Sequence, residues 1–212
     1  MPRAVIFANG SLPDPVKARS LLDADDLILC ADGGLMHARD MGVTPHAVIG
    51  DMDSLSKDVL NELTQSDTQI QLFPSDKDKT DLELALEHAV ELRVSEILIV
   101  AALGKRTDHT LSNIHLLMMD ALDGLDVRID DGIEEIYICK DECVIHGTQG
   151  DIISLLPWNG LAGGVRTEGL KWPLVDETLH PEGSRGISNI MLSERALVSV
   201  AFGVLLVVHE RP

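Results

Sequence analysis

Short apolar runs alternate with segments of helical spacing through the first 130 residues of the chain. The five runs have the length of buried strands, and they cover Ala4–Ala8, Leu27–Ala31, Ala47–Gly50, Ile70–Phe73 and Glu96–Ala102. Strands that alternate with helices form right-handed crossovers, and these place the strands in a parallel sheet with helices on both faces. We therefore expect an α/β fold with a parallel sheet in this part of the chain.

Two of the expected helices have a clear apolar face. Thr80 and Glu83 have the spacing of a capping box, which marks the start of a helix. The apolar positions that follow share one face: Leu82, Ala85, Leu86, Ala89 and Val90. A second helix is expected after Asp108, with an apolar face made of Leu111, Ile114, Met118, Ala121 and Leu122.

The helical period ends near Asp130. The segments that follow are short, β-rich and broken by Gly or Pro, and they include Glu134–Cys139, Glu142–Gly147, Asp151–Pro157 and Gly163–Trp172. The apolar stretch from Ala196 to Val208 is too short to cross a bilayer as a helix, and we expect it to form one or two buried strands. We therefore predict an α/β domain over residues 1–130, followed by an antiparallel β-sandwich or β-roll over residues 131–212.

The chain is strongly acidic, with 17 Lys and Arg against 35 Asp and Glu and a formal net charge of −18 at pH 7. Such an excess of negative charge disfavours nucleic acids and anionic membranes as partners. Aromatic residues make up 3% of the chain, which leaves few rings to stack on single-stranded nucleic acid. An anionic substrate therefore needs metal ions or a local group of basic residues in order to bind.

The three cysteines are Cys30, Cys139 and Cys143, and their spacing does not match a zinc site. An odd number of cysteines, together with an N-terminus that lacks the pattern of a signal peptide, predicts a reducing, cytoplasmic location. We expect these thiols to be buried and to have no metal-binding role.

Polar residues and glycines follow each expected strand of the first domain. In parallel sheets, ligands bind beyond the carboxyl ends of the strands. Four aspartates stand in these loops, after three different strands: Asp32, Asp51, Asp53 and Asp81. Each aspartate alone is also explained by a turn or by the start of the next helix. If the loops converge, however, the four carboxylates repel one another unless a divalent metal lies between them, and oxygen ligands of this kind suit Mg²⁺.

Basic residues stand in the neighbouring loops, at Lys77, Lys79, Lys105 and Arg106. Acidic and basic residues at one edge of a sheet indicate a site for a metal-bound polyphosphate. The chain has neither a Walker A sequence nor a GxGxxG sequence, which argues against a P-loop enzyme and against a dinucleotide oxidoreductase. We therefore expect a polyphosphate that is held without either of these loops.

Eight ordered blocks of the sequence resemble the thiamine pyrophosphokinase family. They are "NG" after the first strand, "ADGG", "GDMDSL", "KDKTDLELAL", "RTDHTLSNI", "SLLP", "GLKWPL" and "ISN". The blocks extend over both expected domains, and their order makes the resemblance specific. It implies an enzyme that transfers the pyrophosphoryl group of ATP to the hydroxyl of thiamine, giving thiamine diphosphate and AMP. It also implies a catalytic α/β domain that binds ATP and Mg²⁺ over residues 1–130, followed by a thiamine-binding β-sandwich domain over residues 131–212.

The resemblance also implies roles for individual residues. It implies Mg²⁺ ligation by Asp32, Asp51, Asp53 and Asp81, and catalytic roles for Asp51, Asp53, Asp81, Arg106 and Asp108. It implies contacts to the phosphates of ATP from Asn9, Asp32, Gly33, Gly34, Lys77, Thr80, Arg106 and His109. Thiamine is expected against Trp172, with Ser188 and Asn189 nearby. Members of the family are usually homodimers, which implies active sites shared between two subunits.

Two positions depart from the usual pattern of the family. Lys105 stands where a second glycine is common before the arginine, and a side chain there either alters nucleotide preference or adds a phosphate contact. Ile190 stands where many bacterial members have an acidic residue, so the resemblance gives no acidic contact to thiamine at this position.

Several alternatives stay open on the sequence alone. Trp172 is either a core residue or a ring presented to a ligand, and the neighbouring Gly169 and Pro173 favour a bend that exposes it. A related pyrophosphokinase for another alcohol, such as a hydroxymethylpterin, would keep the aspartates and lack "GLKWPL". A non-catalytic thiamine- or nucleotide-binding regulator would lack some of the four aspartates. The group that accepts the alcohol proton and the number of metal ions are also open.

Overall fold

The computed structural model describes residues 2–211, and these form two compact units that divide between Gly132 and Ile133. Each unit has its own hydrophobic core. The functional assignment of residues 1–130 to catalysis and of residues 131–212 to thiamine binding remains a prediction.

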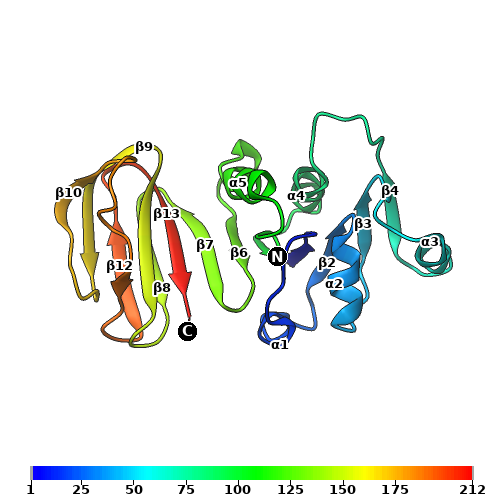
Figure 1. Cartoon of the computed structure of the whole chain (residues 1–212), viewed down its shortest axis with the longest axis horizontal. Helices are drawn as coiled ribbons and strands as arrows, with labels where there is room; N and C mark the ends of the chain where they lie inside the picture. The colour runs from blue at the N-terminus through cyan, green and yellow to red at the C-terminus, as the bar shows by residue number, and fades with distance from the viewer. Residues whose placement is uncertain (1, 212) are drawn as a thin grey trace. The chain divides into compact units, whose positions relative to one another are not determined.

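The N-terminal unit is built on a parallel sheet with the strand order β4-β3-β2-β1-β5-β6 (Figure 1). The strands are β1 (Arg3–Phe7), β2 (Leu27–Ala31), β3 (Ala47–Gly50), β4 (Gln69–Leu72), β5 (Glu96–Val100) and β6 (Asp126–Asp130). The five strands expected from the apolar runs are all present, whereas β6 was not predicted. The strand order changes direction at β1, which lies between β2 and β5, and open α/β sheets bind ligands at such a point.

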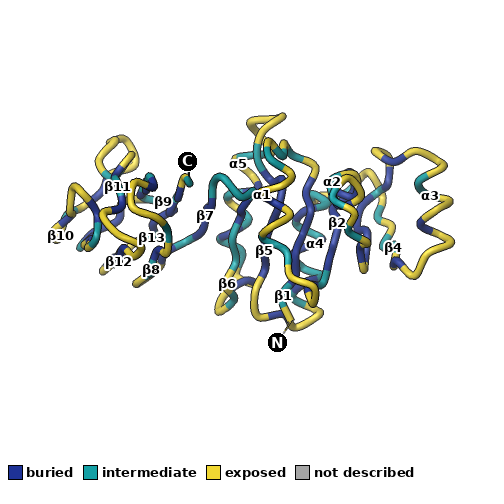
Figure 2. Tube along the Cα trace, turned by 90° about the horizontal axis from the view of Figure 1, so that it is seen from below, coloured by how far each residue is buried: buried dark blue, intermediate teal, exposed yellow. Residues whose placement is uncertain are grey.

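Helices cover both faces of this sheet. They are α1 (Pro15–Arg19), α2 (Gly34–Asp40), α3 (Lys57–Thr64), α4 (Asp81–Glu91), α5 (Thr107–Leu116) and the short 3₁₀ helix η1 (Asp120–Leu122). All residues from Ala4 to Phe7 in β1 are fully buried, and because successive side chains point to opposite faces, both faces must be covered. In Figure 2 the strands β1, β2 and β5 are accordingly buried along most of their length, whereas α3 is largely exposed.

The first of the two predicted helices is confirmed, and the second differs from its prediction. Thr80 caps α4, and its Oγ1 accepts a hydrogen bond from the backbone N–H of Glu83 at 3.2 Å. The prediction for α5 was wrong in its length and its face: the helix ends at Leu116, Leu111 is exposed, and Asn113 is buried instead. The side chain of Asn113 donates a hydrogen bond to the carbonyl of Ala102 at 2.7 Å, so a polar contact decides which face meets the sheet.

The C-terminal unit is an antiparallel β-sandwich, as predicted. Its strands are β7 (Glu134–Cys139), β8 (Glu142–His146), β9 (Ile152–Glu168), β10 (Val175–Leu179), β11 (Asn189–Ile190), β12 (Arg195–Ser199) and β13 (Phe202–Glu210). The first half of β9 pairs with β13, which pairs with β7, and the second half of β9 pairs with β10 and β12. The core between these two layers contains Leu155 and Leu205 from the first layer and Val165 and Val198 from the second.

The strand β9 corrects one prediction. Asp151–Pro157 and Gly163–Trp172 were expected as separate strands, but residues 152–168 form one long strand. Asn159, Gly160 and Gly164 have positive φ angles, so the chain bends there and passes from one layer to the other without a break. The strand ends at Glu168, which leaves Trp172 outside it.

Within residues 2–211, no helix has the length and apolar character needed to cross a membrane.

Candidate active site

The carboxyl ends of β1 to β5 surround a cavity of about 630 Å³ in the N-terminal unit. The loops after all five strands contribute to its lining. The charged side chains that line it are Asp32, Asp51, Asp53, Asp81, Lys77, Lys79, Lys105 and Arg106. These are the acidic and basic residues that the sequence analysis singled out, so the loops do converge, while the role of each residue remains a prediction.

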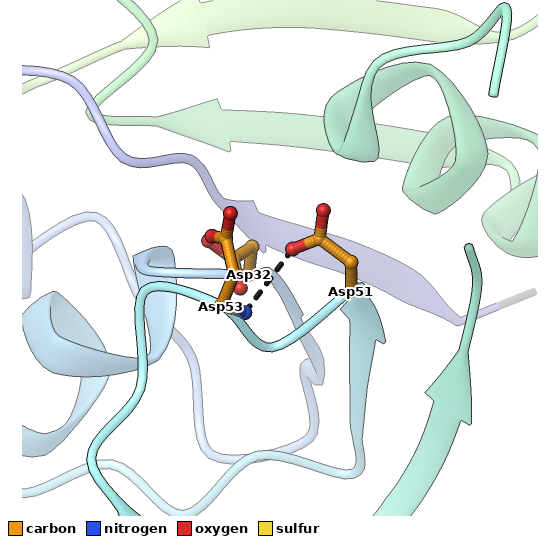
Figure 3. A group of neighbouring side chains, drawn as sticks. All are labelled: Asp32, Asp51 and Asp53. Carbon is orange, nitrogen blue, oxygen red and sulfur yellow. Dashed lines mark hydrogen bonds between the residues drawn. The ribbon is translucent and has the colours of Figure 1, made fainter. Parts of the chain in front are cut away.

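Three of the carboxylates, Asp32, Asp51 and Asp53, form a tight group that we call the acid cluster (Figure 3). Each offers one oxygen atom, and these atoms lie within 4.8 Å of one another. In Figure 3 the carboxylates of Asp51 and Asp53 point to the same side, and the backbone N–H of Asp53 donates a hydrogen bond to Asp51 Oδ1 at 3.1 Å. Asp32 is 6% exposed, and its buried Oδ1 has no hydrogen-bond partner within residues 2–211. A cation would stabilise such a buried carboxylate oxygen beside two further carboxylates.

The backbone around the acid cluster has unusual angles. Asp32 and Met52 have φ angles of 43° and 61°, in the left-handed region that most side chains disfavour. Gly50 has a φ of 151°, and a Cβ atom there would lie 3.0 Å from both Asp32 Cβ and Asp81 Oδ1. A side chain at position 50 would therefore push two carboxylates out of place, which explains the glycine.

Asp51 and Asp53 stand in the turn after β3. Asp53 does not cap the next helix, because Ser56 does so. The backbone N–H of Asp53, the hydroxyl of Ser75 and the charge of Lys77 lower the pKa of Asp51 below its usual range. Asp51 is therefore ionised at neutral pH, as a metal ligand must be.

Asp81, the fourth predicted metal ligand, stands in the first turn of α4. Lys77 Nζ lies 3.1 Å from Asp81 Oδ1 and 3.8 Å from Asp51 Oδ2. Burial raises the pKa of Asp81; Lys77 opposes this effect, and the charges of Asp32 and Asp51 add to it. In the described part of the chain, the group of oxygens within 4.8 Å of one another does not include Asp81. The structure thus brings three of the four predicted ligands together and pairs the fourth with Lys77.

Two other cations of the cavity are each paired with a carboxylate. Lys79 Nζ donates a hydrogen bond to Glu87 Oε1. Arg106 holds Asp108 through two hydrogen bonds, and the one from Nε to Oδ1 measures 3.1 Å. This contact lowers the pKa of Asp108 to about 2. Asp108 is therefore a weak proton acceptor in this conformation, although it was predicted to be catalytic.

Asn9 follows β1 and is held by Lys105 at the edge of the cavity. Lys105 Nζ donates hydrogen bonds to the carbonyl oxygen and to Oδ1 of Asn9, at 2.9 and 3.0 Å. A Cβ atom at position 33 would lie 2.3 Å from Asn9 Nδ2, and one at position 34 would lie 2.0 Å from the carbonyl oxygen of Phe7. Packing against the end of β1 therefore requires Gly33 and Gly34, whose predicted contacts to phosphate stay a prediction.

The other polar residues that line the cavity are Ser54, Ser75, Thr80, His109 and Asn113. Thr80 and His109 stand at the starts of α4 and α5, and both were predicted to lie near the phosphates. Asn113 was missed, because the sequence analysis expected an apolar face for this helix. The spacing of four residues between His109 and Asn113 places them on one side of a helix, and this was the available signal.

A second cavity, of about 290 Å³, lies within the C-terminal unit. Its lining residues are Trp172, Leu174, Ser184, Arg185, Gly186, Ile187 and Asn189. Trp172 is 48% exposed, so it is not a core residue. The side chain of Asn189 fixes this segment, because its Oδ1 accepts a hydrogen bond from Trp172 N at 3.0 Å and its Nδ2 donates one to Trp172 O at 2.7 Å.

Two neighbours of this cavity differ from the sequence-based picture. The backbone N–H of Ser188 donates a hydrogen bond to Ser154 Oγ at 3.0 Å, and Ser188 is not among the described lining residues. Arg185 lines the cavity but was not predicted, and its guanidinium holds Glu177 through two hydrogen bonds of 2.8 and 2.7 Å. No motif in the sequence identifies Arg185, since it lies in a turn and its partner lies eight residues away on β10.

Two family models match the chain. The model for the thiamin pyrophosphokinase catalytic domain matches residues 18–129, which contain most of the larger cavity. The model for the thiamin pyrophosphokinase vitamin B1 binding domain matches residues 138–207, which contain the smaller cavity. Together the two models cover most of both units.

Individual proteins agree with these models. The chain is 28% identical to thiamine pyrophosphokinase of Bacillus subtilis over 196 residues, which is 89% of each chain. It is 27% identical to thiamine pyrophosphokinase 1 of Arabidopsis thaliana, over 92% of this chain and 81% of the relative. Among solved structures, it resembles the crystal structure of the Bacillus subtilis enzyme, with a TM-score of 0.89, 25% identity and 99% of each chain covered. The thiamin pyrophosphokinase of Geobacillus thermodenitrificans gives a TM-score of 0.83 at 25% identity, over 100% of this chain and 98% of that one.

Proposed function

Because the chain belongs to the thiamine pyrophosphokinase family, we propose that it transfers the pyrophosphoryl group of ATP to the hydroxyl group of thiamine, giving thiamine diphosphate and AMP. The observation that carries this proposal is the acid cluster with its flanking cations, at the carboxyl edge of the N-terminal sheet. A related enzyme for another alcohol is not favoured, because the C-terminal unit matches a vitamin B1 binding domain. A non-catalytic regulator is not favoured either, because all four aspartates are retained and line one cavity.

We further propose that the acid cluster holds Mg²⁺. Its three carboxylates fit this ion, which prefers oxygen ligands and keeps room for waters and substrate phosphates. The buried Oδ1 of Asp32, which has no partner among the described residues, supports the same assignment. When bound, Mg²⁺ would neutralise the charge of the phosphates and stabilise AMP as the leaving group. Asp81 would complete the set once Lys77 turns toward the nucleotide.

The residues of the chain itself align the substrates. Phosphoryl transfer needs in-line positioning and charge neutralisation more than covalent help from the protein. Lys77 lies on the β4 side of the acid cluster, where it reaches both Asp51 and Asp81. Arg106 uses two of its five N–H donors on Asp108, so it keeps donors for a phosphate oxygen without leaving this partner.

We place the rings of thiamine at the smaller cavity, against Trp172. The indole is half-exposed, and Lys171 Nζ lies over its ring at 4.7 Å from the centroid. A cationic heterocycle would therefore bind the opposite face of the ring or displace Lys171, while Asn189 holds the backbone of Trp172 in place. The only arginine among the described lining residues, Arg185, is neutralised by Glu177, so it repels a cationic vitamin only weakly. We also propose a homodimer with shared active sites, which the family resemblance implies.

Product analysis tests this function. Purified protein with ATP, MgCl₂ and thiamine is expected to release AMP and thiamine diphosphate in equal amounts. Asp51→Asn and Asp53→Asn are each expected to lower kcat by about a thousandfold, because each removes a charge that faces the metal and the phosphates. Asp58→Asn, an exposed acid in the first turn of α3, is the matched control and should retain activity. Formation of ADP and thiamine monophosphate, or full activity of both cluster variants, would contradict the proposal.

A further inference from the structure

The four cations that line the larger cavity differ in what their charges face. Lys77, Lys79 and Arg106 each lie against at least one carboxylate. Lys105 instead donates its two hydrogen bonds to neutral oxygen atoms of Asn9. Within residues 2–211, no carboxylate lies within ion-pair distance of Lys105. In the described part of the chain, Lys105 is thus the cation of this cavity that has no direct ion-pair partner, and it lines a predicted polyphosphate site.

The backbone of Lys105 is strained. Its φ is 56°, and the preceding Gly104 has a φ of 77°, so two successive residues have left-handed conformations. A glycine adopts this conformation freely, whereas a residue with a Cβ atom does so at a cost in free energy. A strained residue that lines a cavity indicates a role beyond folding, because glycine at this position would give a more stable folded state.

The position of Lys105 relative to the acid cluster indicates what it binds. The strand order is β4-β3-β2-β1-β5, so the loops that carry Asp51 and Asp32 lie between the loop of Lys77 and the loop of Lys105. The acid cluster therefore has cations on both sides. A polyphosphate that is held at the acid cluster through a metal extends toward one of these cations. Lys105 can bind it, because its ammonium group has a third N–H donor beyond the two that it uses on Asn9.

We propose that Lys105 binds a phosphate group of ATP on the β5 side of the acid cluster, and so sets the affinity of this chain for its nucleotide. Asn9 holds the side chain in position before the nucleotide arrives. The inference rests on the proposed function of the cavity.

Two variants separate the charge of Lys105 from its backbone strain. Lys105→Met removes the charge and keeps the strain, whereas Lys105→Gly removes both. Each is expected to raise the KM for ATP about tenfold, the usual effect of losing one hydrogen bond to a charged group, with the KM for thiamine unchanged. The Gly variant should melt about 2–4 °C above the Met variant, because glycine relieves the positive φ. Lys105→Arg should restore most of the affinity for ATP.

Arg93→Gly is the matched control. Arg93 is an exposed cation with a φ of 57°, located just after α4 and not among the described residues of the cavity. This variant loses the same charge and relieves the same kind of strain. It should raise Tm without changing the KM for ATP.

The outcomes distinguish this inference from the proposed function. If the wild-type protein forms AMP but both Lys105 variants keep its KM for ATP, the inference is wrong and the function stands. An increase in the Gly variant alone would assign the effect to a more flexible loop and would also overturn the inference. If the wild-type protein forms no AMP from ATP and thiamine, the proposed function itself fails. Titration with ATP and Mg²⁺ in the absence of thiamine gives an independent reading of affinity in every variant.

Discussion

Replacing Asp32 by Asn is expected to stabilise the protein in the absence of Mg²⁺. The oxygens of the acid cluster lie within 4.8 Å of one another, and two unit charges at such a separation repel by ~3 kcal/mol at an effective dielectric constant of ~20. Asp32 faces two such charges, but Asp53 is exposed and Asp51 is partly so. After screening by solvent we expect a gain of ~1–2 kcal/mol, or a rise in Tm of about 2–8 °C for a chain of this size.

The same change should remove the response to Mg²⁺. A ligand at ten times its dissociation constant stabilises a folded protein by ~1.4 kcal/mol, so Mg²⁺ should raise the Tm of the wild-type protein by about 3–6 °C. Asp32→Asn should lose most of this increase, because it replaces the most buried carboxylate of the cluster with an amide. The assay is thermal unfolding of both proteins with and without MgCl₂, and Asp58→Asn serves as the control for loss of one charge.

Two results would refute this reasoning. If Asp32→Asn melts below the wild-type protein without Mg²⁺, the carboxylate contributes to the fold and does not suffer repulsion. If the variant gains as much from Mg²⁺ as the wild-type protein does, the ion binds elsewhere. The first result would overturn the repulsion argument, and the second would overturn the placement of the metal at the acid cluster.

Three further outcomes are expected. Trp172→Ala should raise the KM for thiamine about two- to thirtyfold with little change in the KM for ATP, as expected for loss of one cation–π contact. Thiamine should also lower the intrinsic tryptophan fluorescence of the wild-type protein, and the same decrease in Trp172→Phe would show that the ring of Trp172 is only structural. His209 is buried, with Nε2 2.8 Å from Asp151 Oδ2 and Nδ1 3.4 Å from Glu135 Oε2; burial lowers its pKa, but the two carboxylates outweigh this effect and raise it overall. The protonated His209 therefore stabilises the fold fully below about pH 6.5, and this contribution is lost as the pH rises through the raised pKa of His209. Over this range the Tm of the wild-type protein should fall relative to the Tm of His209→Gln. Parallel profiles of Tm against pH for the two proteins would contradict the assignment. Light scattering should give a homodimer at micromolar concentration, and a fully active monomer would exclude shared active sites.

The sequence was sufficient for the parts of the fold that follow from periodicity. The five apolar runs are strands of the sheet, and Thr80 caps α4 as its spacing indicates. Periodicity failed at α5, where the buried position is Asn113 and its amide bonds to the carbonyl of Ala102. It failed again at β9, because glycines with positive φ bend this strand and do not end it. In both regions, contacts distant in sequence decided the local structure.

The sequence predicts which residues form the candidate site, but it does not predict which of their side chains contact one another. Carboxyl ends of parallel strands meet at one edge, so the grouping of Asp32, Asp51 and Asp53 follows from the position of each in its loop. Nothing in the sequence indicates that Lys77 turns to Asp81 or that Lys105 turns to Asn9, because these contacts depend on the path of the loops. The ion pair of Arg185 and Glu177 in the C-terminal unit also depends on the path of a loop, and no sequence motif predicts it.

The transfer of two phosphoryl groups as one unit distinguishes this enzyme from a simple kinase. The most direct measurement uses ATP that carries one radioisotope in its β-phosphate and another in its γ-phosphate, incubated with thiamine, Mg²⁺ and the purified protein. Both labels are expected in thiamine diphosphate at a ratio of one to one, with unlabelled AMP as the other product. Recovery of the γ label alone in a thiamine product, with the β label remaining in ADP, would contradict pyrophosphoryl transfer.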